Sequence, residues 1–406
     1  MNNRRSVEFL SYREFAVDYA PKQDYVIILK EEIIVILDNF SSHKAKDTAI
    51  QRNIFKYPRD KQNNLVLFDD VGSYPTPNGF KRRWIEDSIE CNENEEEIYE
   101  IIKKAFLDKI RAGVDVPTYP QFRNMNSQFL NPIKKEEEPY LIREENANIK
   151  EIELIEEIGR DIFEETGERI KLRVCITGPI ELYLGEFGGR NYFDILKNLS
   201  KSIDRFAKNS ILNKKQIFTH TISIDEPSIG LNPEINFSSE EIAEALSLAT
   251  EGINVDTEIH LHSSIYYKTI CEVEGIDVIG VETASDMKRI RTIDKDYLER
   301  YDKFLRVGIA RTDISSLSAE INEKYDINVW MNTDSLWKVF ESESVKNIRD
   351  RLNYAYREFG DLIRYVGPDC GLGSWPSQEM AFQLLKTVRT AIDIFRKDFN
   401  KMDEMA

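Results

Sequence analysis

Short apolar runs alternate with longer segments of helical periodicity from about residue 65 to the end of the chain. Eight such runs occur, at residues 65–71, 114–117, 172–176, 218–224, 257–261, 278–281, 305–309 and 362–366. Helical patterns follow them, and one begins clearly at Ser238, where Glu241 completes a capping box. Strands that alternate with helices indicate parallel β–α units, and eight of them match a closed eight-fold barrel. The pattern therefore predicts an α/β fold, a (β/α)8 TIM barrel.

An open, doubly wound sheet is the alternative that the same alternation allows. Such a sheet tends to carry a Gly-rich phosphate turn early in the chain, and none appears here. We place the barrel at residues 61–406, which leaves residues 1–60 as an N-terminal extension. Within it, residues 25–37 hold two apolar runs around a Lys-Glu-Glu centre, a pattern typical of a β-hairpin, although the usual Asn-Gly or Gly turn signal is missing.

Composition narrows the class of protein. The 406 residues carry a net charge of -17, which argues against a nucleic-acid surface, since that would need a basic face. No apolar run approaches the roughly 18 residues that would suggest a membrane span. The 4 cysteines are scattered and form no disulfide framework. We therefore expect a soluble protein of the reducing cytoplasm, with neither nucleic acid nor membrane as a partner.

Metal-ligand residue types follow three of the predicted strands. His262, Glu282 and Cys370 each come shortly after an apolar run. In a β/α barrel the active site lies at the carboxyl ends of the strands, so these side chains should converge. Histidine, carboxylate and thiolate together are a zinc-site composition. The alternative for Cys370 alone is a buried, unreactive cysteine, which is the commonest fate of a free thiol.

Seven segments in order along the chain resemble the catalytic barrel of cobalamin-independent methionine synthase and its shorter archaeal-type relatives. They are Val-Gly-Ser-Tyr-Pro at 71–75, Ala-Gly-Val-Asp-Val at 112–116, Ile-Thr-Gly-Pro at 176–179, Ile-Asp-Glu-Pro at 224–227, Ile-His-Leu-His at 259–262, Val-Glu-Thr at 281–283 and Pro-Asp-Cys-Gly-Leu at 368–372. Each is weak alone, and their joint order at successive strand ends carries the resemblance, which covers about residues 65–400.

The resemblance implies a ligand set. In that family zinc is held by a His-x-Cys pair, a Glu and a distant Cys, and the thiol of homocysteine joins the metal. Carried over, the ligands are His262, Glu282 and Cys370, with Ser264 at the place of the first cysteine. Three protein ligands and an open position is also the usual catalytic zinc arrangement. We expect His260 to pack or hydrogen-bond beneath His262, and Cys271 to stay outside the site.

The resemblance also implies how the substrate is held. Ser73 would bind the acid group of homocysteine and Asp225 its ammonium group, while Gln121 stands where the family has a second acidic residue. Family members that use methylfolate carry a histidine as general acid where this chain has Ser315. Because a serine cannot protonate a folate nitrogen at neutral pH, a corrinoid donor is favoured over methylfolate.

These features predict a zinc-dependent methyltransferase that moves a methyl group from a corrinoid-type donor, free or on a small protein, to a thiol. The favoured thiol is homocysteine, which would give methionine. Two alternatives stay open. One is methyl or alkyl transfer to coenzyme M, and the other is a barrel that has lost its metal and serves as a non-catalytic binding subunit.

Overall fold

The computed structural model of the chain describes residues 26–29, 32–35, 66–331 and 333–403. The chain divides into two compact units, Met1–Pro58 and Arg59–Ala406. In the first unit, β1 (Val26–Leu29) and β2 (Glu32–Val35) pair in antiparallel fashion. The turn between them and the rest of the predicted extension lie outside the described residues.

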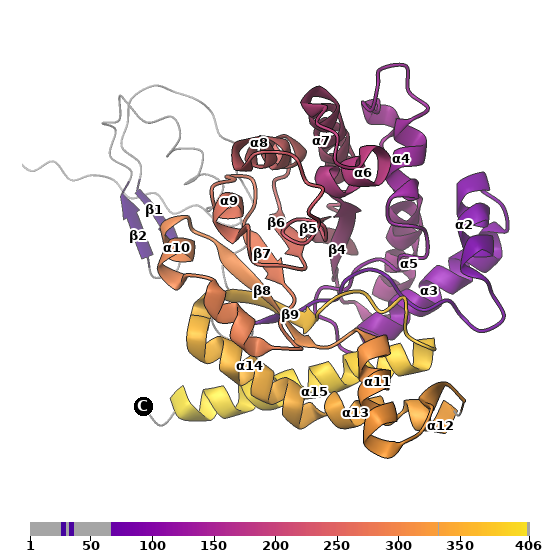
Figure 1. The fold of residues 1–406 in the computed structure, drawn as a ribbon, viewed down its shortest axis with the longest axis vertical. Coiled ribbons are helices and arrows are strands. Elements are labelled where there is room, and N and C mark those ends of the chain that lie inside the picture. The colour runs from indigo at the N-terminus through magenta and orange to yellow at the C-terminus, as the bar shows by residue number, and fades with distance from the viewer. Residues whose placement is uncertain (1–25, 30–31, 36–65, 332, 404–406) are drawn as a thin grey trace, which may run out of the picture. The chain divides into compact units, whose positions relative to one another are not determined.

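The second unit is built on a parallel sheet of seven strands in the order β3-β9-β8-β7-β6-β5-β4 (Figure 1). The strands are β3 (Leu67–Phe68), β4 (Ile170–Thr177), β5 (Ile217–Asp225), β6 (Asp256–Leu261), β7 (Val278–Val281), β8 (Phe304–Ala310) and β9 (Ile363–Pro368). Seven of the eight predicted apolar runs are these strands. The predicted TIM-barrel fold is confirmed.

The remaining predicted run lies between the two edge strands of the sheet. Val116 makes a parallel bridge to Asp69 beside β3, and Thr118 makes one to Arg173 of β4. These isolated bridges do not extend into a ladder because Pro117 and Pro120 lack the backbone N–H that each rung needs. The segment therefore fills the second position of the barrel without being a regular strand.

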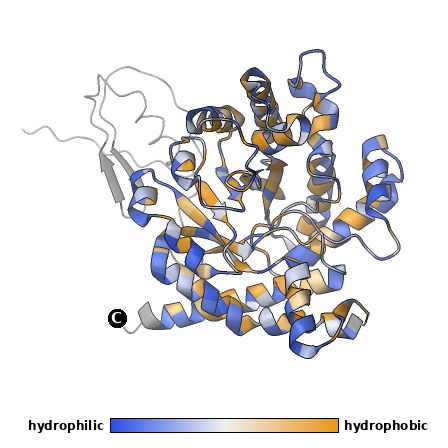
Figure 2. Ribbon diagram, viewed as in Figure 1, coloured by the Kyte–Doolittle hydropathy of each residue, from blue (hydrophilic) through white to orange (hydrophobic). Residues whose placement is uncertain are grey.

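Helices surround the sheet, and Figure 2 shows that hydrophobic residues predominate along the strands and alternate with hydrophilic ones along the helices (Figures 1 and 2). They are α2 (Arg82–Cys91), α3 (Glu95–Arg111), α4 (Ser127–Ile133), α5 (Lys150–Thr166), α6 (Pro179–Phe187), α7 (Phe193–Asn209), α8 (Ser239–Thr250), α9 (Tyr267–Cys271), α10 (Lys295–Arg300), α11 (Ile314–Tyr325), α12 (Thr333–Leu336), α13 (Val339–Ser342), α14 (Val345–Phe359) and α15 (Gln378–Asp403). The predicted capping box is present, since Ser238 and Glu241 exchange hydrogen bonds at the start of α8. Among the described residues, no helix has the length and apolar character needed to span a membrane.

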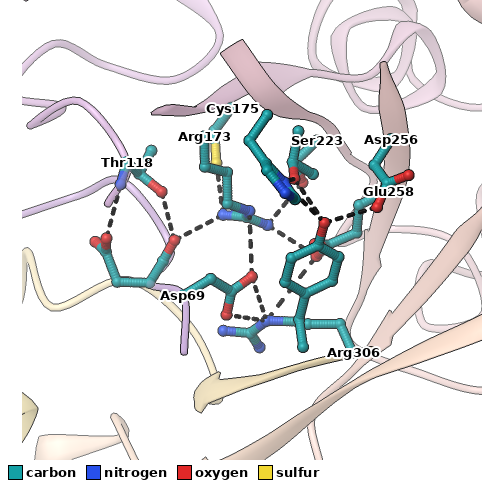
Figure 3. Close-up of polar contacts among 12 residues, drawn as sticks. Asp69, Thr118, Arg173, Cys175, Ser223, Asp256, Glu258 and Arg306 are labelled. Atoms are coloured by element: carbon teal, nitrogen blue, oxygen red, sulfur yellow. Dashed lines mark hydrogen bonds and ion pairs between the residues drawn. The ribbon is translucent and has the colours of Figure 1, made fainter. Parts of the chain in front are cut away.

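One layer of the barrel interior is made of charged side chains. Asp69, Arg173, Glu258 and Arg306 come from alternate barrel positions and are fully buried (Figure 3). Such a layer of four is normally filled by Val, Ile or Leu. Here Arg306 Nε lies 3.0 Å from Asp69 Oδ1, and Arg173 Nη2 lies 2.8 Å from Glu258 Oε1. Two arginines and two carboxylates thus neutralise one another inside the barrel.

Small residues on the other strands make room for this charged layer. A Cβ atom added to Gly280 would lie 2.7 Å from Glu258 Oε1, and one added to Gly367 would lie 3.0 Å from Arg306 Nη2. Below it, Val116, Val278 and Tyr365 form a separate apolar cluster. The Tyr365 hydroxyl also hydrogen-bonds with Thr221 and Asp256, so the base of the barrel is less charged than its middle but not wholly apolar.

Breaking the charged layer should destabilise the protein more than breaking a surface ion pair. Arg306→Met keeps the side-chain length but leaves Asp69 and Glu258 short of a partner. We expect a loss of about 3–5 kcal/mol in unfolding free energy, the usual cost of removing one partner from a buried pair. Urea denaturation measures it. Arg291→Met, which removes an exposed pair with Glu358, is the control and should change little. Equal losses in both variants would contradict a structural role for the layer.

Candidate metal centre

Three strands bring the metal-ligand residue types to one end of the barrel. His260 lies within β6, and His262 follows its last residue. Glu282 follows β7, which pairs with β6 in a register that sets Leu261 beside Val281. Cys370 follows β9 by two residues. Because side chains two apart on a strand point to the same face, both histidines project from β6 in the same direction.

Four ligand-type atoms converge there. The relevant atoms of His260, His262, Glu282 and Cys370 all lie within 4.8 Å of one another. His262 Nε2 is 3.2 Å from Glu282 Oε1 and 3.7 Å from Cys370 Sγ, while His260 Nε2 is 3.7 Å from Glu282 Oε1. The structure thus brings together the three residues that the sequence predicted, and adds His260.

His260 is packed beneath His262 as expected from the sequence, but it makes none of the hydrogen bonds that the sequence allowed. Both of its ring nitrogens are buried and have no hydrogen-bond partner within the part of the chain that the structure describes, and the same holds for Glu282 Oε1. Buried polar atoms are almost always satisfied, so three orphaned acceptors or donors in one place call for a ligand. The His-x-His spacing at the end of β6 is the sequence feature that could have predicted this grouping, because residues two apart on a strand point to the same face.

The electrostatic setting keeps the histidines neutral. Burial lowers the pKa of His260 well below its ordinary value, and the positive charge of Arg306 lowers it further. Burial also lowers the pKa of His262. Neutral imidazole is the form that binds metals. The charged layer beneath this group therefore favours a neutral His260.

The acidic members of the group hold protons more tightly than usual. Burial, followed by the nearby charge of Asp369, raises the pKa of Glu282 to about 7. Burial, followed by the charge of Glu282, raises the pKa of the Cys370 thiol. A cation bound among these groups would favour their ionised forms.

The loop that carries Cys370 is anchored from two sides. Arg306 Nη2 donates to the carbonyl of Pro368 at 2.7 Å. Asp369 Oδ1 accepts the backbone N–H groups of Thr283 and Ala284, both at 3.0 Å, which ties this loop to the residues just after Glu282. Gly308 permits the approach, because a Cβ there would lie 1.9 Å from Asp369 Oδ1.

The residues expected to hold a substrate border this loop. Ser73 Oγ accepts the N–H of Gly373 at 3.2 Å, and a Cβ added to Gly371 would lie 2.0 Å from that oxygen. Asp225 ends β5 and accepts the hydroxyl of Ser223 at 2.8 Å. Burial raises the pKa of Asp225, and its charge contributes to the raised pKa of Cys370. Ser73 and Asp225 therefore lie close to the metal-ligand group.

Gln121 is packed into the barrel wall. Its backbone forms an isolated parallel β-bridge with Ser73. Its side-chain Nε2 donates to Tyr119 Oη at 2.9 Å and to the carbonyl of Cys175 at 3.1 Å. Its Oε1 lies against Gly72, where a Cβ would come within 2.1 Å. The amide is thus engaged within the protein, and it adds no negative charge to the site.

Two other sequence candidates are engaged elsewhere. The Ser264 hydroxyl is 2.7 Å from Thr292 Oγ1, in the connection that follows β6. Cys271 is buried in the hydrophobic core at the end of α9, where burial raises the pKa of its thiol to about 11. The fourth ligand-type residue is His260 rather than either of these.

Comparisons with known proteins agree on the architecture. No protein-family model matches the chain, and no curated protein matches it. Among solved structures, it is similar to a B12-independent methionine synthase from Shewanella sp. W3-18-1 in complex with selenomethionine, with a TM-score of 0.53 and 15% identity over 83% of this chain and 99% of that one. It is also similar to a methyltransferase from Methanosarcina mazei, with a TM-score of 0.49 and 13% identity over 86% of this chain and 98% of that one. At 15% identity the likeness to the Shewanella enzyme establishes the fold alone, a (β/α)8 barrel.

Proposed function

We propose that this chain is a zinc-dependent methyltransferase that uses a thiol as methyl acceptor. The observation that carries the proposal is the convergence of His260, His262, Glu282 and Cys370 at the carboxyl end of the barrel. The Shewanella enzyme with the same fold is a methionine synthase, which supports a thiol as the acceptor here.

The donor set fits zinc. Two imidazoles, one carboxylate and one thiolate are ligand types that zinc accepts, and the soft thiolate favours it over magnesium or calcium. Ionised Glu282 and Cys370 together would balance the charge of a divalent ion. Zinc, when bound, would supply a Lewis acid that lowers the pKa of a substrate thiol and keeps it as the nucleophilic thiolate. Because Glu282 would itself stay ionised as a ligand, the proton that the thiol loses would pass to water.

The surrounding residues suit a short amino-acid thiol such as homocysteine. Ser73 lies beside the Cys370 loop, where its hydroxyl and adjacent backbone groups can hold an acid group. Asp225 is the carboxylate available to pair with an ammonium group. Since Gln121 is uncharged and turned into the wall, amine recognition rests on Asp225 alone. That single carboxylate keeps coenzyme M, a thiol without an amine, as the second candidate.

The open face of the barrel suits a large apolar donor. Phe80, Met125, Leu231 and Ile265 are exposed by 39%, 38%, 59% and 73%, and each lies in a connection that follows a barrel strand or the 116–121 segment. Ser315 is exposed in the first turn of α11 and offers no acid group near neutral pH. Both features favour a methylated corrinoid, free or carried by a protein, over methylfolate as the methyl donor.

Zinc should bind at about one ion per chain and depend on the four residues. Cys370→Ala should abolish tight binding, because the soft ligand is lost, and His260→Ala should weaken it by about 10–100-fold. Metal analysis of purified protein, followed by competition with a chelator, measures both effects. Cys91→Ala removes an exposed thiol and is the matched control. Unchanged affinity in His260→Ala would show that His260 is not a ligand, and metal-free wild-type protein that cannot be loaded would favour the non-catalytic alternative.

Zinc affinity should rise with pH around neutrality. Since the pKa of Glu282 is raised to about 7, a proton competes with the metal below that value and is released above it. The affinity should therefore fall as the pH drops through 7. In Glu282→Gln the affinity should be lower throughout, and its pH dependence should be shallower by about one proton per zinc. A chelator titration at several pH values measures the slope, and identical slopes for both proteins would rule out Glu282 as the competing group.

The zinc-loaded protein should demethylate methylcobalamin in the presence of homocysteine and show no turnover with methyltetrahydrofolate. Asp225→Asn should raise the KM for homocysteine about tenfold, the usual effect of losing a hydrogen bond to a charged group. Its effect on coenzyme M, which lacks the amine, should be smaller. Turnover with methylfolate would overturn the donor assignment, and a preference of the wild-type protein for coenzyme M would favour the second acceptor.

A further inference from the structure

Two adjacent arginines at the start of α2 have different surroundings. The side chain of Arg83 is 89% exposed, and its Nε lies 3.7 Å from Asp87 Oδ2, one helical turn further on. Arg82 is half-buried and forms no ion pair with any residue that the structure describes. The acid one turn after it, Glu86, instead accepts the backbone N–H of Asn124 at 2.6 Å. Arg82 therefore keeps a positive charge that no described carboxylate balances.

The guanidinium of Arg82 reaches the loop that carries Cys370. Its Nη2 donates to the carbonyl of Gly373 at 3.3 Å, and this is the one hydrogen bond of the side chain among the described residues. A guanidinium has several N–H donors, so most of its capacity to donate is unused within the protein.

Ser73 lies on the same side of Gly373 as Arg82. The N–H of Gly373 donates to Ser73 Oγ at 3.2 Å. A Cβ atom added to Gly373 would lie 2.8 Å from Arg82 Nη2 and 3.0 Å from Ser73 Oγ, so both groups border one point beside this glycine. All three residues are partly exposed, which gives a small ligand access to the guanidinium and the hydroxyl together.

This pair of polar groups is joined to the metal-ligand group by a short stretch of chain. Ser73 Oγ lies 2.0 Å from the position of a Cβ atom added to Gly371, the residue after Cys370. The N–H of Leu372 donates to the carbonyl of Ser73 at 2.8 Å, which fixes the Ser73 segment against the same loop. A molecule whose acid group binds at Ser73 and Arg82 would therefore extend its remaining atoms beside Cys370.

We infer that Arg82 binds the acid group of the methyl acceptor, and that the acceptor is therefore an anionic thiol. The inference rests on the proposed methyl transfer to a thiol. The N–H groups of a guanidinium match the paired oxygens of a carboxylate or a sulfonate, and the Ser73 hydroxyl adds another donor. Homocysteine and coenzyme M both carry such an acid group, whereas a neutral thiol does not. Arg82 selects for the charge of the acceptor, and the choice between these two is left to Asp225.

Calorimetric titration with S-methylated acids tests the inference without requiring turnover. Methionine and 2-(methylthio)ethanesulfonate are the methylated forms of the two acceptors. Methioninol has the skeleton of methionine with a hydroxymethyl group in place of the acid. Wild-type protein should bind at least one of the two acids saturably, and should bind methioninol about tenfold more weakly than methionine or not at all.

The variants separate Arg82 from its neighbour. Arg82→Met should weaken binding of the acid by about 10–100-fold, the usual loss for one charge-assisted contact. Arg82→Lys should recover part of the affinity, because it restores the charge but not the planar group. Gly373→Ala should also weaken acid binding, since its methyl group would occupy the point between Arg82 Nη2 and Ser73 Oγ. Arg83→Met is the matched control and should leave the affinity within about twofold.

Three results would overturn the inference. They are the absence of saturable binding of either acid, equal weakening by Arg82→Met and Arg83→Met, and equal affinity of the wild-type protein for methionine and methioninol. The zinc content and the Tm of Arg82→Met should match those of Arg83→Met, which excludes a damaged loop as the cause. If Arg82→Met does not fold, Arg82→Lys and Gly373→Ala decide the question.

Failure of the proposed function gives a different pattern. Protein that cannot be loaded with zinc, yet binds methionine in a manner that depends on Arg82, would contradict methyl transfer and still support Arg82 as the residue that binds the acid group. Turnover with the same homocysteine KM in wild type and Arg82→Met would support methyl transfer and remove Arg82 from the acceptor site.

Discussion

The buried ionic layer formed by Asp69, Arg173, Glu258 and Arg306 is the interaction on which the rest of this barrel depends (Figure 3). It joins four alternate positions of the barrel at its centre. A purely apolar layer at this height would form no hydrogen bonds with the residues above it. Because charges removed from water must be compensated, each member fixes the position of the others. Small neighbours such as Gly280 and Gly367 leave the space that these long side chains occupy.

The same layer organises the candidate metal centre above it. Arg306 donates to the carbonyl of Pro368 and so holds the loop on which Cys370 sits. Its charge, together with burial, keeps the pKa of His260 low and the imidazole neutral. The first effect is mechanical and the second is electrostatic. Both would favour the binding of a cation by this group. Asp369 then locks the Cys370 loop to the residues after Glu282.

At the barrel end, Glu282 and Cys370 are partly buried and hold their protons more tightly than usual, so a bound cation would favour their ionised forms. A metal ion that displaces these protons would suit such a setting.

Local pattern by itself determined the eight-fold alternation, the capping box at Ser238 and the placement of His262, Glu282 and Cys370 at strand ends. These features depend on short-range periodicity and on the rule that parallel strands share a carboxyl end.

The tertiary structure decided the rest. Whether His260 supports the site or joins it depends on which atoms face its ring across the barrel, and the engagement of Ser264 by Thr292 depends on a contact 28 residues away. The irregular second barrel position follows from Pro117 and Pro120, but its place in the ring follows from bridges to both edge strands. The ionic layer is assembled from distant segments, so no local pattern reveals it, because burial and charge balance are properties of the folded chain.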